Sequence, residues 1–104
     1  MELATEEQER LVKTLKTLAN QTRLKIIASL AKEPKHAYAL AKELGVSYPL
    51  AHLHLKGLRK MGLVEEIREE LKAEGLPTVK TYAPVEFKLT LTPEYIRDLF
   101  QEEG

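Results

Sequence analysis

The stretch SYPLAHLHLKGLRKMGLV, residues 47–64, carries two histidines, three basic residues and no acidic residue. Successive residues of a helix lie about 100° apart around its axis, which divides the stretch into two faces. One face is almost entirely apolar and consists of Ala51, His54, Leu55, Leu58 and Met61. The opposite face is polar and basic and consists of Tyr48, His52, Lys56 and Arg59. The stretch is therefore predicted to form a helix with one buried side and one positively charged side.

The two histidines of this helix are not expected to bind one metal ion together. His52 and His54 lie about 200° apart on a helix, whereas a helical two-histidine site uses positions i and i+4. We interpret His54 as a structural histidine that is hydrogen-bonded at the edge of the core. His52 belongs to the polar face, for which two interpretations are open. The face is either an ordinary solvated surface or a DNA recognition surface, with its N-terminal half in the major groove and its basic residues on phosphates.

The preceding sequence predicts three further helices. A Thr5–Gln8 capping box begins the first helix, at about residues 4–18, and Asn20 caps a second helix that ends at Glu33. The second helix is predicted to bury a stripe of three residues, namely Leu24, Ile27 and Leu30. A short third helix ends at Gly45, and Ser47 caps the fourth. The third and fourth helices form a helix-turn-helix at about residues 36–61.

After Gly62 the sequence pattern changes to that of β-strands. Strands are predicted over Val64–Glu70 and Val79–Leu91, with turn residues between them, so that residues 63–91 form a hairpin or wing. Thr92 and Pro93 then begin a last helix, at about residues 93–103. The expected fold is thus a single α+β domain over residues 1–104, mostly helical, with four helices, two strands and a final helix. That order is the winged helix-turn-helix plan.

Composition narrows the functional class. The chain has 104 residues, 43% hydrophobic and 31% charged, which is typical of a soluble globular domain. It has no cysteine, which excludes disulfides, thiolate metal sites and cysteine nucleophiles. We see no membrane span and no signal peptide, so the expected location is the cytoplasm, without membrane partners. Many Lys and Glu residues with few Asn and Gln follow a thermophilic trend.

Two motifs resemble those of the ArsR-like regulators of bacteria and archaea. LKTLANQTRLKII, residues 15–27, is similar to the family's LxALAxxTRLxIL signature, and the matching positions are Ala19, Thr22, Arg23, Leu24 and Ile27. Residues 47–64 are similar to the SQPTVSxHLKxLRxAGLV recognition helix, and the matching positions are Ser47, Pro49, His54, Leu55, Lys56, Leu58, Arg59, Gly62, Leu63 and Val64. The resemblance covers about residues 10–92. It implies a homodimeric transcriptional regulator, which we expect to be a repressor, that binds double-stranded DNA through a recognition helix in the major groove.

The resemblance assigns expected roles to particular residues. Those expected to face the groove are Tyr48, Pro49, His52, Leu53 and Lys56. Those expected to face phosphates are Ser47, Arg59 and Lys60 on the helix, with Arg68 and Lys80 on the wing. The expected dimer interface consists of Leu3, Leu11, Tyr95, Ile96, Leu99 and Phe100, although these apolar stripes could instead close the core of a monomer.

The chain departs from the family at its sensor positions. The family's Cys-x-Cys metal pair falls on His36 and Tyr38, and the last helix lacks the Asp-x-His zinc pattern, so no metal or cofactor is expected and an effector is not identified. Glu65, Glu66, Glu69 and Glu70 at the start of the wing would repel phosphate. They favour the alternative of a winged-helix protein–protein interaction module in a transcription-related assembly. No catalytic constellation is present in the sequence, so an enzyme is not expected.

Overall fold

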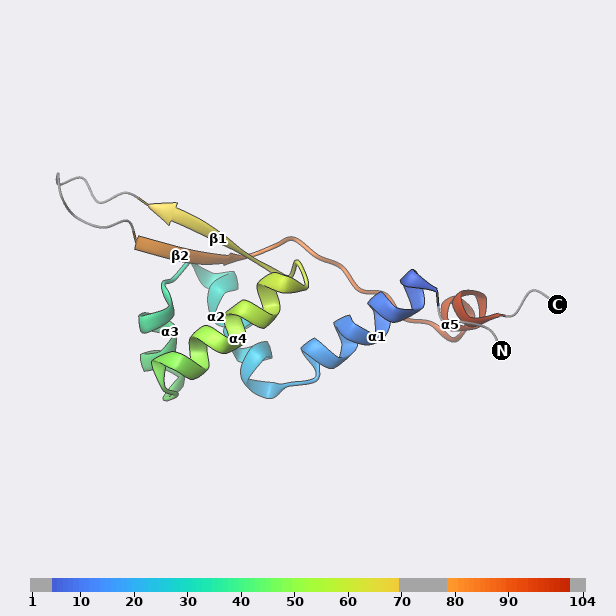
Figure 1. Ribbon diagram of the computed structural model, residues 1–104, viewed down its shortest axis with the longest axis horizontal. Coiled ribbons are helices and arrows are strands. Elements are labelled where there is room, and N and C mark those ends of the chain that lie inside the picture. Colours follow the sequence, from blue (N-terminus) through green and yellow to red (C-terminus); the bar gives the residue numbers. More distant parts are fainter. Residues whose placement is uncertain (1–4, 70–78, 102–104) are drawn as a thin grey trace.

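The computed structural model describes residues 5–69 and 79–101, and it confirms the predicted winged helix-turn-helix order (Figure 1). The elements are α1 (Glu6–Leu18), α2 (Gln21–Lys32), α3 (Ala37–Leu44), α4 (Tyr48–Lys60), β1 (Val64–Glu69), β2 (Val79–Pro84) and α5 (Pro93–Phe100). Helices α2, α3 and α4 pack with the hairpin into one body, whereas α1 and α5 lie together at the far end of the molecule. We call α1 and α5 the arm. The predicted ends of the terminal helices at residues 4 and 103 fall outside the described residues.

Local capping interactions begin the helices. Four helices begin at the predicted side chains, each of which accepts a backbone N–H: Thr5, Asn20, Ser47 and Thr92. Helix α3 begins at a cap that the sequence did not predict, because His36 Nδ1 accepts the N–H of Ala39 at 3.3 Å. Gly45 has a φ of 68°, in the left-handed region that glycine adopts without strain, which allows the tight turn between α3 and α4.

The core lies between α2, α3, α4 and the hairpin. Its largest fully buried side chains are Ile26, Leu30, Leu40, Leu55 and Leu58. The predicted stripe on α2 was wrong at Leu24, which is 51% exposed. The inward face of α2 instead carries Arg23, Ile26 and Leu30, at the i, i+3 and i+7 spacing of a helix. Because Arg23 is charged, the apolar residues alone did not show the helical periodicity of this inward face.

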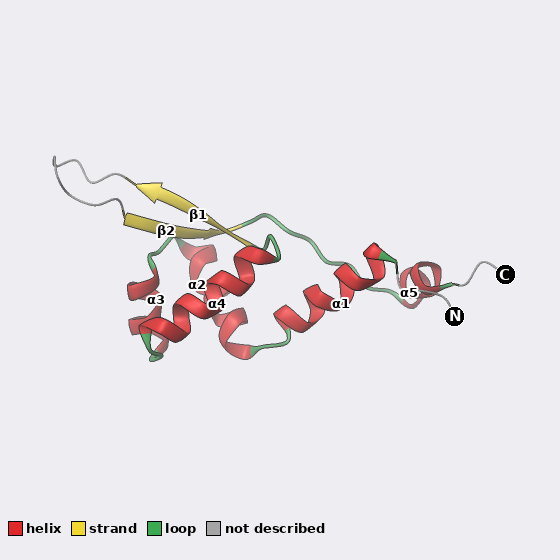
Figure 2. Cartoon of the chain, viewed as in Figure 1, coloured by secondary structure: helices red, strands yellow, loops and turns green. Residues whose placement is uncertain are grey.

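The wing is an antiparallel hairpin that pairs Val64 with Pro84 and Glu69 with Val79. The predicted second strand, Val79–Leu91, was wrong beyond Pro84. Pro84 lies opposite the first residue of β1 and has no N–H, so the ladder ends there except for one bond from Val85 N to Leu63 O at 3.0 Å. The chain then continues without regular structure to α5 (Figure 2). Glu70 and the predicted turn residues 72–77 lie outside the described residues.

Arg23 connects its own helix, α2, with α4 and with the end of α1. Its Nε donates to His54 Nδ1 at 3.1 Å, and its Nη1 donates to the carbonyl oxygen of Thr17, the next-to-last residue of α1, at 3.2 Å. The guanidinium also lies against Gly57, where an added Cβ would come within 3.1 Å of Nη2. His54 is 8% exposed, so its interpretation as a structural histidine is confirmed. Burial lowers the pKa of His54 and the charge of Arg23 lowers it further, which favours the neutral ring that can accept this bond.

We expect Gly57→Ala to lower the free energy of unfolding, although alanine is about 1 kcal/mol more favourable than glycine inside a helix. The new methyl group would press on Arg23, which cannot move away without lengthening its bonds to His54 and Thr17. In an Arg23→Ala background the same substitution should instead raise the free energy of unfolding by about 1 kcal/mol.

Urea unfolding of the native protein, Gly57→Ala, Arg23→Ala and the double variant measures this reversal in the sign of the effect of Gly57→Ala. An equal gain from Gly57→Ala in both backgrounds would mean that Arg23 is not held in place as described.

Candidate nucleic-acid interface

Helix α4 turns its predicted polar face to solvent. Its inner side is fixed by the buried residues Ala51, His54, Leu55 and Leu58. The exposed residues include all five predicted to face the groove, namely Tyr48, Pro49, His52, Leu53 and Lys56. No acidic residue lies on α4. The structure therefore brings the five together on one side of one helix, which we call the recognition face.

The side-chain rings of Tyr48 and His52 pack together at the N-terminal end of this face. Tyr48 and His52 are one helical turn apart, and their rings stack with centroids 6.0 Å apart and an interplanar angle of 14°. Stacking reduces the freedom of two side chains that can each donate or accept a hydrogen bond at a base edge. Ser47 lies next to them, but its hydroxyl already accepts the N–H of Leu50 at 3.2 Å as the helix cap.

The basic residues at the other end of α4 lie in a different environment. Arg59 Nη1 forms an ion pair with Glu66 Oε2 at 2.8 Å, and the Glu66 side chain is only 9% exposed. Arg59 and Lys60 also line a cleft whose opposite wall is formed by α1 residues. Ser47 and Arg59 are separated by about 18 Å along the helix, at 1.5 Å per residue. The residues predicted to face phosphates are thus divided between the two ends of the helix.

The Arg59–Glu66 ion pair also changes the interpretation of the acidic wing. Glu66 does not extend the exposed negative surface, because its side chain lies against the body and is neutralised by Arg59. Of the described part of β1, Glu65 is exposed. On β2, Lys80 is exposed and is the register partner of Arg68, whose side chain is not among those described.

The sensor positions of the third helix have structural roles or are exposed. His36 caps α3 through Nδ1, and Tyr38 projects into solvent. Within residues 5–69 and 79–101, no group of three or more His, Asp or Glu side chains is arranged to hold a metal ion. Helices in the same part of the chain are also too short and too polar to cross a membrane.

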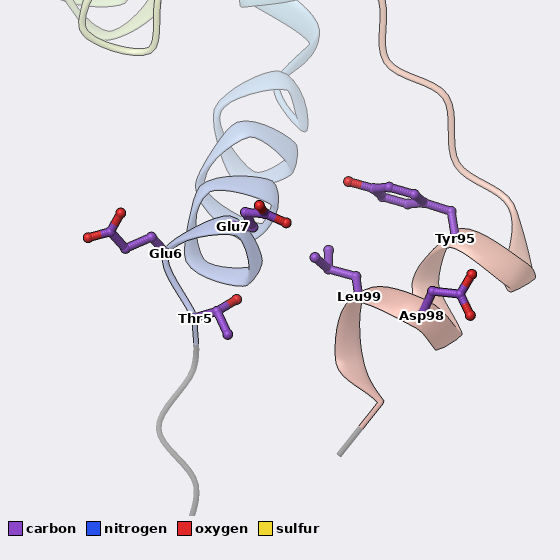
Figure 3. Close-up of a pocket in the computed structure, with 6 residues that line it drawn as sticks. All are labelled: Thr5, Glu6, Glu7, Tyr95, Asp98 and Leu99. Atoms are coloured by element: carbon purple, nitrogen blue, oxygen red, sulfur yellow. The ribbon is translucent and has the colours of Figure 1, made fainter. Parts of the chain in front are cut away.

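The arm carries the residues predicted for a dimer interface. Tyr95, Ile96 and Phe100 are exposed, and Leu11 and Leu99 are half-buried, whereas Leu3 lies outside the described residues. Gln8 Nε2 donates to the carbonyl oxygen of Leu99 at 2.8 Å, which ties α1 to α5. Figure 3 shows Tyr95 and Leu99 directed toward the start of α1 across a shallow pocket.

The sequence analysis did not assign to the dimer interface other exposed apolar residues of the arm and of the segment that leads to it. These are Val12 and Leu15 on α1, and Phe87, Leu89 and Leu91 on the segment that leads to α5. The alternation of Phe87, Leu89 and Leu91 with polar residues was the available signal, but it was attributed to a strand of the wing.

A helix-turn-helix with an exposed basic second helix, followed by a two-stranded hairpin, defines a winged helix-turn-helix protein. Residues 20–66 match the family described as "Bacterial regulatory protein, arsR family". The chain is also 40% identical over 92 residues to an uncharacterized HTH-type transcriptional regulator from Methanocaldococcus jannaschii, covering 88% of this chain and 94% of that relative.

Solved structures show the same likeness. NolR from Sinorhizobium fredii is 27% identical with a TM-score of 0.64, covering 95% of this chain and 90% of that chain. Reduced HlyU from Vibrio cholerae is 25% identical with a TM-score of 0.64, covering 93% and 95%. A homodimeric winged helix-turn-helix DNA-binding domain from Mycobacterium bovis is 32% identical with a TM-score of 0.62. That match covers 73% of this chain and 64% of that chain, just under two thirds of its length.

The chain belongs to the ArsR family, as its two motifs suggested. It is accordingly a transcriptional regulator with a DNA-binding helix-turn-helix, and not an enzyme.

Proposed function

We propose that the protein is a homodimeric repressor that binds a specific double-stranded DNA sequence by inserting one α4 into the major groove at each half-site. The observation that carries this proposal is the recognition face, which is exposed, free of acidic residues and held outward by the buried side of α4. Its aromatic and imidazole groups suit base edges, and Lys56 suits a phosphate. A DNA-bound regulator would act in the cytoplasm.

The geometry of the arm supports the homodimer. Neither α1 nor α5 has a buried residue, although α5 is strongly amphipathic. The radius of gyration is 17.5 Å, whereas a compact domain of this length has about 13 Å. An apolar arm that buries so little of itself is stabilised by packing against the same arm of a second copy. A symmetric pair would present two recognition helices to half-sites about one helical turn of DNA apart.

The alternative is a protein-interaction module that uses the acidic wing. The exposed carboxylate of Glu65 favours it, but Glu66 is neutralised by Arg59 and cannot add to such a surface. DNA binding is therefore the better-supported of the two functions.

Two substitutions on the recognition face should have different effects. Lys56→Ala should weaken binding to every duplex and reduce the log–log salt slope by about 0.9, the loss of one phosphate contact. His52→Ala should instead reduce the preference for the specific duplex by about 1–3 kcal/mol, because it removes a contact with one base pair. The measurement is fluorescence anisotropy with a duplex from upstream of the protein's own coding sequence and with a scrambled duplex, each at two salt concentrations.

Lys25→Ala, at an exposed position on α2, is the control and should bind like the native protein. Identical behaviour of the Lys56 and His52 variants would contradict the assigned roles. A native protein that binds neither duplex at low salt would favour the protein-interaction alternative.

The dimer proposal predicts that Ile96→Asp separates the two copies. Ile96 is an exposed apolar residue of the arm, and burying a carboxylate at an interface is strongly unfavourable. Sedimentation equilibrium should give twice the chain mass of 11.8 kDa for the native protein and the chain mass for the variant, with the helical circular dichroism of the body retained. Arg97→Ala, also on α5, should remain dimeric, and a monomeric native protein would refute the proposed assembly.

A further inference from the structure

The segment that joins β2 to α5, residues 85–91, belongs neither to the recognition face nor to the arm. Its sequence is VEFKLTL, in which apolar and polar residues alternate. Such alternation is typical of a strand that buries one of its two faces. Residues 86–91 are nevertheless all exposed, and Phe87, Leu89 and Leu91 are 40%, 41% and 41% exposed. The described parts of one copy therefore cover neither face of this segment.

The backbone of the segment also lacks partners within one copy. Residues 86–91 form no hydrogen bond with residues 5–69 or 79–101. The last backbone bond before them runs from Val85 N to Leu63 O, next to the first residue of β1. N–H and C=O groups that are unpaired along an extended chain are a template for pairing with a strand of another chain. The segment thus offers both backbone groups and an apolar face to a partner.

The hydrogen bonds at the end of the wing identify the edge that is open to a partner. Successive residues of a strand direct their N–H and C=O groups to opposite edges. Because Val85 donates toward β1, the next residue, Glu86, directs its groups to the opposite edge when the strand is extended, and Lys88 does the same. That edge is the one on which Tyr82 pairs with Lys35. Beyond that pairing, the edge has no partner among the described residues.

We propose that residues 85–89 pair with the same residues of a second copy as antiparallel strands, with the two-fold axis between the two Phe87 side chains. Glu86 of each copy then lies opposite Lys88 of the other, and each of these pairs exchanges its backbone hydrogen bonds. Val85 lies opposite Leu89 of the second copy, on the same face as Phe87. The inference rests on the proposed homodimer and gives it an interface that the arm does not contain.

Charge and alternation select this register over its neighbours. An axis at Glu86 or at Lys88 would place two like charges directly opposite each other, which is destabilising. An axis at Leu89 would place Lys88 opposite Thr90 and lose both attractive pairs. A shift by one residue would set the apolar face of one strand beside the polar face of the other. The axis at Phe87 forms both Glu–Lys pairs and keeps the apolar side chains on one face.

The paired segments need a surface to pack on, because two strands alone are marginally stable in water. Val12 and Leu15 on α1 are exposed apolar residues. Both α1 and the segment extend between the body and α5 (Figure 1). In the proposed dimer the apolar face of the paired segments and the two α1 helices bury one another, so the strand pairing adds to the arm contacts.

The first test uses the absence of cysteine from the chain, since one introduced thiol is then the only one. Phe87 falls at a non-hydrogen-bonded position of the pair, where opposite Cα atoms lie about 4.5 Å apart, within reach of a disulfide. Phe87→Cys should therefore give a disulfide-linked dimer under mild oxidation. Leu89→Cys, on the same face, is the control. Its copies lie about 13 Å apart along the strands and should stay unlinked.

The second test exchanges the paired charges. Glu86→Lys should raise the dimer dissociation constant about 10-fold, because a lysine then lies opposite Lys88 of the other copy on both sides of the axis. Adding Lys88→Glu restores opposite charges and should return the constant to within about 2-fold of the native value. Glu65→Lys makes the same change at an exposed position of β1 and should have no effect. Sedimentation equilibrium measures all four proteins.

The outcomes separate this inference from the proposed function. If the native protein is dimeric but Phe87→Cys links no more than Leu89→Cys, or Glu86→Lys dissociates like Glu65→Lys, the strand pairing is overturned and the homodimer stands. If Glu86→Lys weakens the dimer and Lys88→Glu does not restore it, the register is overturned. If the native protein is monomeric, the strand pairing and the homodimer are both overturned.

Discussion

The hydrogen bond from Arg23 to His54 acts together with the buried residues Ala51, Leu55 and Leu58 to fix the rotation of α4 about its own axis. His54 is held inward by this bond, and because His52 lies about 200° away it must then face outward. The same guanidinium reaches the end of α1 and lies against Gly57, so one partly buried cation connects the arm, the core and the recognition helix. Arg23 uses Nε and Nη1 to donate to two different helices, α4 and α1.

The body and the arm have different proposed roles, which are DNA recognition and dimerisation. The body buries the apolar core and carries the recognition face, and the wing is attached to it through both strands, at the paired residues Glu66 and Tyr82. One attachment is the backbone pairing of Lys35 with Tyr82, and the other is the ion pair of Arg59 with Glu66. The arm buries little and exposes its apolar side chains to solvent, so in the proposed homodimer a second copy would stabilise it. In that dimer, the position of one recognition helix relative to the other would be set by the arm and not by the helices themselves.

Local signals in the sequence predicted much of this structure. The caps at Thr5, Asn20, Ser47 and Thr92 were readable because a cap involves residues only three apart in sequence, and Gly45 marked the turn for the same reason. The end of β2 was not readable, since Phe87, Leu89 and Leu91 continue the alternation of a strand and only the start of β1 limits the pairing. Leu24 was assigned to the core because the apolar pattern could not reveal that Arg23 shares the inward face of α2. The Arg59–Glu66 ion pair involves residues that only folding brings together, so the sequence named Arg59 as an expected phosphate contact without revealing its acidic partner.

The most direct test of the account is the map of backbone amide chemical-shift changes when the protein is titrated with its own upstream duplex. Insertion of α4 into the major groove predicts that the largest changes lie at the start of α4, around Tyr48, His52 and Lys56, with smaller changes near Lys80 and none on α5. Changes concentrated on β1 or on the arm, with α4 unaffected, would contradict it, because the surface that binds DNA would then not be the one that Arg23 and His54 hold outward.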